Sequence, residues 1–92
     1  MSGVSREQRN VIGEQVRLKR KQFGLKQGEL AARCTLSGFL IEASGISKIE
    51  NHKRTVSDLE MILISKALRV SLLDLVPEEL PNWKKDTRPP SA

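Results

Sequence analysis

The chain has 92 residues, of which 38% are hydrophobic and 3% aromatic, so it predicts one small domain with a mainly aliphatic core. A formal net charge of +5 favours a polyanionic partner. The sequence has one cysteine and one histidine, which excludes a disulfide framework and the usual zinc sites. It has no apolar run near the ~20 residues that span a bilayer, which excludes a membrane helix. We therefore expect a cytoplasmic protein that needs neither a cofactor nor a membrane.

The positive charge is concentrated at the N-terminal end of the chain. Residues 1–27 hold seven basic and two acidic residues, whereas residues 55–81 hold two basic and five acidic residues. A solvated helix face would explain the basic cluster Arg17–Lys21 taken alone. The polarity along the whole chain instead favours a basic binding surface on its first half.

Start and stop signals in the first half predict three helices. Ser5 and Gln8 have the form of a capping box, and Gly24 ends the helix that follows. One face of that helix is apolar, with Ile12, Val16 and Phe23. A second helix begins near Gln27 and places three small or aliphatic residues inward, namely Leu30, Ala31 and Cys34. After a less regular stretch, a third compact segment covers about 44–51, with Ile46 and Ile49 inward.

The second half predicts two more helices and a tail. Ser57 and Glu60 form a capping box before a helix with several apolar residues available to the core: Leu59, Ile62, Leu63, Ala67 and Leu68. Ser71 and Asp74 repeat this device, and Pro77 ends the last element. No alternating pattern indicates a strand. The sequence therefore predicts an all-α domain of five helices over residues 5–80, followed by a flexible polar tail over 81–92.

Three segments, in this order, resemble the lambda-repressor-like (Cro or XRE-type) helix-turn-helix family of DNA-binding proteins. They are Val16-Arg17-x-x-Arg20-x-x-x-Gly24-Leu25-x-Gln27-x-x-Leu30-Ala31, then Ile46-Ser47-Lys48-Ile49-Glu50-Asn51 with Lys53 and Arg54, and last Ala67-Leu68-x-Val70-Ser71-Leu72-x-x-Leu75. Together they span about Ile12 to Val76. The resemblance implies the five-helix fold of that family, in which the second and third helices form the helix-turn-helix.

The basic first helix and the resemblance together give eight DNA-binding residues: Arg17, Gln27, Ser44, Ser47, Lys48, Asn51, Lys53 and Arg54. Gln27 begins the second helix, where free backbone N–H groups suit a phosphate, and it can also brace the recognition helix. An ordinary exposed residue is the alternative for Gln27 and for Lys48. The resemblance assigns Arg20 and Glu50 to a buried structural ion pair, although an arginine also suits phosphate.

The sequence departs from the family in the turn between the second and third helices, which is about five residues longer, around residues 36–41. As a result, Ala43, Ser44 and Gly45 occupy the positions where relatives carry base-reading side chains. Alanine and glycine cannot make bidentate contacts to bases. Direct readout would then fall on Ser44, Lys48 and either Glu42 or atoms of the loop.

Two further residues stand out against the family pattern. His52 replaces the glycine that usually follows the recognition helix, so we expect a left-handed turn there, with the ring facing the same surface as Lys53. Trp83 lies beyond the matched region, where it could cap the core, join a dimer contact or remain free.

These observations predict a sequence-specific regulator of transcription, of bacterial or phage type, that binds a double-stranded DNA operator without catalysis. No glycine-rich phosphate loop, paired carboxylates or nucleophile elbow indicates an enzyme. The alternative is an antitoxin or adaptor module that also binds a protein partner. An RNA-binding adaptor is a third class, against which the scarcity of aromatic residues argues.

A two-fold homodimer through the C-terminal helix is expected, since one domain presents only one short helix to a groove. The residues available for this contact are apolar: Leu72, Leu73, Leu75, Val76, Leu80 and Trp83.

Overall fold

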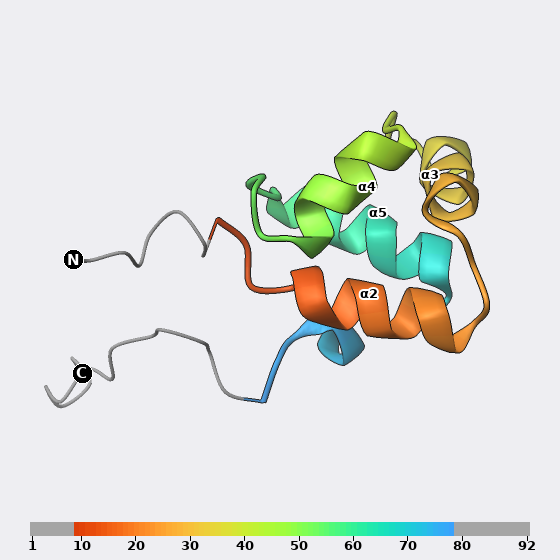
Figure 1. Ribbon diagram of the computed structural model, residues 1–92. Helices are drawn as coiled ribbons and strands as arrows, with labels where there is room; N and C mark the ends of the chain where they lie inside the picture. The colour runs from red at the N-terminus through yellow and green to blue at the C-terminus, as the bar shows by residue number, and fades with distance from the viewer. Residues whose placement is uncertain (1–8, 79–92) are drawn as a thin grey trace, which may run out of the picture.

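Figure 1 shows the computed structural model, in which residues 9–78 are described. Within this part of the chain there are four α-helices, one turn of 3₁₀-helix and no strand. The elements are α2 (Gly13–Gln22), α3 (Gln27–Leu36), α4 (Ala43–Glu50), α5 (Asp58–Leu68) and the 3₁₀ turn η1 (Leu72–Leu75). The prediction of an all-α fold is confirmed. The Ser5–Gln8 capping box, both expected domain limits and the tail 81–92 lie outside the described residues.

The fifth predicted helix is a single 3₁₀ turn, η1, so residues 9–78 contain four α-helices where the sequence predicts five helices. The capping box predicted at the start of this turn is present: the carboxylate of Asp74 accepts a hydrogen bond from the N–H of Ser71 at 3.1 Å. Pro77 follows two residues after the turn and lacks the N–H that would continue it. Leu75 is fully buried and fixes η1 against α2 and α5.

The helices enclose one core. In Figure 1, α4 lies in front of α5, α2 runs below them, and α3 lies at one side of the bundle. The buried residues that form the core are Ile12, Val16, Leu30, Ala31, Cys34, Phe39, Ile46, Ile49, Ile64, Ala67, Leu68 and Leu75. Burial raises the pKa of the Cys34 thiol to about 11, so this cysteine is the small core residue that the sequence predicts.

Two predicted inward faces are partly wrong. Phe23 follows α2 as its C-cap and is nearly half exposed, whereas Ile12 and Val16 are fully buried. On α5, Leu59 and Ile62 face outward, and Ile64 is buried in their place. The reason is that α5 carries apolar residues on all sides, so that periodicity alone cannot select the buried face.

The end of α2 and the start of α5 lie where the sequence predicts them, whereas α2 begins at Gly13 and not soon after Ser5, because residues 9–12 are not helical. Gly24 ends α2 with a φ of +70°, a conformation that costs a glycine little. At the start of α5, the Ser57 hydroxyl accepts from the Glu60 N–H, and the Glu60 carboxylate accepts from the Ser57 N–H, each at 3.1 Å. These contacts satisfy backbone groups that would otherwise lack partners at a helix start.

Gly13 lies where the start of α2 closely approaches the end of α4. A Cβ atom at this position would lie 2.2 Å from the carbonyl oxygen of Ile49, in α4. Only a residue without a side chain allows the start of α2 to lie this close to the end of α4.

We predict that Gly13→Ala destabilises the fold by about 1–3 kcal/mol, because the added methyl group pushes two backbone segments apart. The matched control is Gly28→Ala in α3, where a Cβ atom meets nothing within 4 Å. That change removes a flexible residue from a helix and should stabilise the fold by about 0.5–1 kcal/mol. Denaturant unfolding of both variants measures the two effects, and equal effects would contradict this packing.

Candidate nucleic-acid interface

The helix-turn-helix consists of α3, α4 and the turn 37–42 between them. Phe39 is buried beneath this turn, and its N–H donates to the carbonyl of Cys34 at 2.8 Å. Gly38 supplies the φ of +105° that brings Phe39 inward. The longer turn is therefore a packed loop, held by one aromatic side chain.

A buried ion pair fixes the end of α4 against α2. Arg20 donates to both carboxylate oxygens of Glu50, from Nε at 2.6 Å and from Nη2 at 3.1 Å. Their side chains are 9% and 2% exposed. Gln27, at the start of α3, donates its amide to Glu50 at 3.1 Å, and Arg20 also donates to the Leu25 carbonyl at 2.8 Å. These hydrogen bonds compensate both buried charges and join α2, α3 and α4 at one point. Arg20 therefore has a structural role.

Asn10 provides a second anchor for α4, which the sequence reasoning missed. Its side-chain oxygen accepts from the N–H groups of Ile12 and Gly13 at the start of α2, at 3.1 and 2.7 Å. Its side-chain nitrogen donates to the carbonyls of Ile49 and Arg54, at 3.0 and 2.9 Å. An asparagine just before a helix is a helix-start signal, and this is the only indication of its role in the sequence.

The chain leaves α4 through a left-handed residue, His52, with a φ of +60°. The N–H of His52 donates to the Ile49 carbonyl, and that of Lys53 donates to the Lys48 carbonyl, which together form a Schellman ending. The expected left-handed turn is present. The expected ring direction is wrong, because Nδ1 of His52 lies 3.0 Å from the carbonyl oxygen of Asn10, toward the start of α2.

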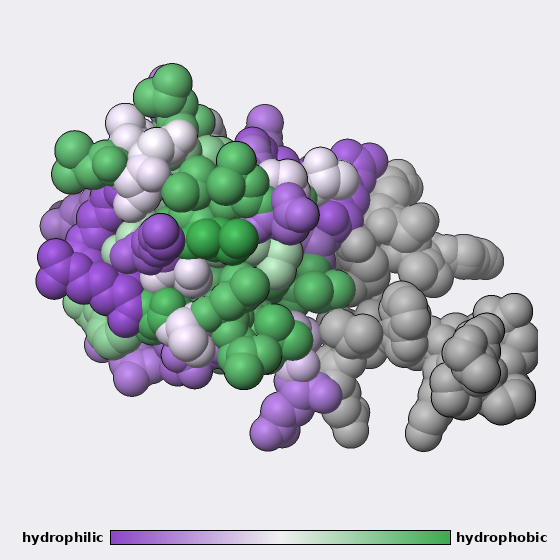
Figure 2. All heavy atoms as spheres, turned by 180° about the vertical axis from the view of Figure 1, so that it is seen from behind, coloured by the Kyte–Doolittle hydropathy of each residue, from purple (hydrophilic) through white to green (hydrophobic). Residues whose placement is uncertain are grey.

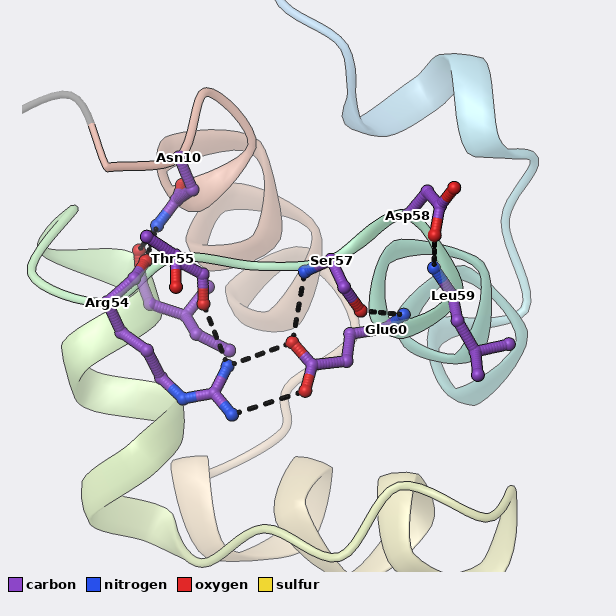
Figure 3. Close-up of polar contacts among 8 residues, drawn as sticks. Asn10, Arg54, Thr55, Ser57, Asp58, Leu59 and Glu60 are labelled. Carbon is purple, nitrogen blue, oxygen red and sulfur yellow. Dashed lines mark hydrogen bonds and ion pairs between the residues drawn. The ribbon is translucent and has the colours of Figure 1, made fainter.

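Arg54 is held by partners within the protein (Figure 3). Its guanidinium donates to both carboxylate oxygens of Glu60 at 3.2 and 3.4 Å, and lies 5.4 Å from the ring centre of Phe39. Partial burial raises the pKa of Glu60, but the hydrogen bonds from Arg54 and Ser57 and the charge of Arg54 outweigh it and leave that pKa below its usual value. Arg54 thereby ties the long turn to the start of α5.

The remaining predicted residues lie on accessible surface. Four of them follow one another along α4 and its cap at helical spacing: Ser44, Ser47, Lys48 and Asn51. This stripe lies opposite the buried residues Ile46, Ile49 and Glu50. The Asn51 amide donates to the Ser47 carbonyl at 2.9 Å, which orders the end of the stripe. Arg17 and Lys53 are exposed on α2 and on the loop, and Gln27 is half-buried.

The model of the helix-turn-helix family matches residues 16–75, more than half of the chain. This chain belongs to the helix-turn-helix family of Cro and C1 type. Among solved structures, the helix-turn-helix protein is similar to the restriction-modification controller protein C.AhdI from Aeromonas hydrophila, with 30% sequence identity and a TM-score of 0.59. The alignment covers 70% of this chain and 86% of C.AhdI. No sequence among curated proteins matches the chain.

Family membership and the similar structure support a DNA-binding regulator of bacterial or phage type and do not point to an enzyme. They give no support to an antitoxin or adaptor. Between residues 9 and 78 of the helix-turn-helix protein, no His, Cys, Asp and Glu side chains gather in a group that could hold a metal ion. Over the same residues, every helix is too short or too polar to cross a membrane.

We predict that Arg20→Ala and Glu50→Ala each destabilise the helix-turn-helix protein by about 3–5 kcal/mol, and that the double variant costs less than their sum. Removing one partner leaves the other charge buried without compensation. The control cycle uses Arg54 and Glu60, which are more exposed and should be coupled by about 1 kcal/mol or less. Unfolding in denaturant measures both cycles, and additive effects at Arg20 and Glu50 would refute the buried pair.

Proposed function

We propose that this protein is a sequence-specific regulator of transcription that binds double-stranded DNA in the cytoplasm of a bacterium, as a host or phage repressor does. The observation that carries the proposal is the polar stripe Ser44, Ser47, Lys48 and Asn51, which α4 presents opposite its buried face. A helix of this kind enters the major groove, and its N-terminal residues reach the base edges. The similarity to a restriction-modification controller protein supports a regulatory role.

The surrounding residues then supply contacts to phosphate and to bases. Arg17 on α2 and Lys53 on the loop after α4 are exposed cations. Gln27 stands at the start of α3, where free N–H groups favour an anion. We expect Ser44 and Lys48, both exposed on α4, to meet base edges. Arg54 also lies on the loop after α4, where the carboxylate of Glu60 balances its charge.

We predict that binding to duplex DNA weakens with salt, with a slope of about −4 to −5 in a plot of log K against log salt concentration, since about four to six phosphates are contacted. Lys53→Ala should reduce this slope by about one and weaken binding to all sequences alike. Lys66→Ala, on α5, removes an exposed lysine outside the stripe and serves as the control. A titration with an operator selected from random duplexes measures these slopes, and a slope near zero would refute the proposal.

We also propose that two copies of the chain pair through α5 and η1. Figure 2 shows apolar side chains gathered over these elements, on the face opposite the view of Figure 1. The exposed large apolar residues of α5, of η1 and of the residue that follows η1 are Leu59, Ile62, Leu72, Leu73 and Val76. Leu75 was expected among them but is buried in the core, and Leu80 and Trp83 lie outside the described residues. Two copies related by a dyad would read half-sites about 34–36 Å apart.

We predict that Leu73→Glu shifts the protein toward monomer, because it places a charge within the apolar surface. Leu73 is 80% exposed, so the change leaves the core intact. The matched control is Leu40→Glu, which changes a leucine of 83% exposure on the turn before α4. Sedimentation without DNA compares the two variants with the unchanged protein, and a monomer for all three would contradict pairing in solution.

A further inference from the structure

The first turn of α4 lacks the side chains that usually recognise bases. Ala43, Ser44 and Gly45 together offer one short hydroxyl group. A single hydroxyl cannot make the bidentate hydrogen bonds by which arginine, asparagine or glutamine distinguish base pairs in the major groove. The end of α4 that would lie deepest in the groove must therefore use other chemistry.

What this end of α4 does present is a hollow of mixed lining, whose apolar part is formed by Leu40 and Ile41. The side chain of Ile41 lies against the backbone of Gly45, where a Cβ atom would fall 2.5 Å from its Cγ1 and 2.8 Å from its Cδ1. Any larger residue at position 45 would displace Ile41. Leu40 lies beside it with 83% of its surface exposed. This open hollow is lined by these residues and their neighbours, namely Thr35, Leu40, Ile41, Glu42, Ser44 and Gly45.

The position of Leu40 is fixed by its neighbours on the turn. Phe39, the preceding residue, is buried and carries the guanidinium of Arg54 over its ring. Ile41, the following residue, is half-buried against Gly45. Leu40 thus projects outward from a turn that is anchored on both sides. The backbone at Leu40 is therefore already ordered, so a partner that covers this residue immobilises only its side chain.

We propose that the apolar part of this hollow recognises the C5-methyl group of a pyrimidine in the major groove, with Leu40 as the residue that determines this preference. The C5-methyl group is the apolar feature that base edges present in that groove. Thymine and 5-methylcytosine both carry it. The carboxylate of Glu42, on the rim of the hollow, repels phosphate and can accept a hydrogen bond from the amino group of a neighbouring base. The inference rests on the proposed function, because it needs α4 to lie in the groove.

The experiment begins with a site selected by the unchanged protein from random duplexes. Each thymine of that site is then replaced in turn by deoxyuridine, which removes only the methyl group. We expect at least one replacement to weaken binding about three- to five-fold, the value for one buried methyl group. At the same position, a comparison of cytosine with 5-methylcytosine shows whether a methyl group on cytosine is recognised as well as the methyl group of thymine. A gain for 5-methylcytosine indicates recognition of the methyl group on either base, and no gain restricts it to thymine.

Two leucine variants assign the effect to a residue. Leu40→Ser should bind thymine and deoxyuridine duplexes equally. Leu36→Ser should keep the discrimination, because Leu36 is 88% exposed but lines a different hollow with Arg33 and Lys66. Circular dichroism melting checks that both variants fold. Equal binding of all methylated and unmethylated duplexes by the unchanged protein, or discrimination that survives Leu40→Ser, would overturn the inference. Failure to bind any duplex would instead contradict the proposed function.

Discussion

The position of α4 depends on a carboxylate that is almost completely buried. Glu50 accepts hydrogen bonds from Arg20 and Gln27, so one side chain joins α4 to the helices before it. A buried charge is tolerated only when its hydrogen-bonding capacity is met, and here two donors from different helices meet it. Asn10 holds the same end of α4 through the Ile49 carbonyl. Both contacts hold the last turn of α4, one through a side chain and one through the backbone. They therefore fix the orientation of the exposed stripe of α4 relative to the core.

Local signals in the sequence predicted local structure well. The capping boxes at Ser57 and Ser71 depend on residues only three positions apart. The left-handed turn at Gly24 depends on that one residue. Such short-range features can be read from the sequence directly. Burial of Ile46, Ile49 and Cys34 followed from helical spacing. The all-α class therefore needed no knowledge of tertiary contacts.

Contacts between distant segments were harder to foresee. Asn10 meets partners 39 and 44 residues away, and nothing near it in the sequence indicates them. The pairing of Arg20 with Glu50 was expected only through a family resemblance, since periodicity does not select a partner. Arg54 was predicted only as a DNA-binding residue, whereas the fold also places Phe39 of the turn and Glu60 of α5 around it. The outward face of α5 was missed because helix propensity and apolar content were uniform around it.

The anchoring of α4 at one end has an evolutionary consequence. The residues that hold the helix lie at its C-terminal end, whereas the long turn and the first residues of α4 lie at the other. Among residues 40–44, exposed side chains such as Leu40 and Ser44 can be exchanged without breaking a buried hydrogen bond. Gene duplicates could thus acquire new operators by changes in this short segment, while selection for a stable fold acts elsewhere in the chain. Divergence in target preference would then proceed at little risk to folding.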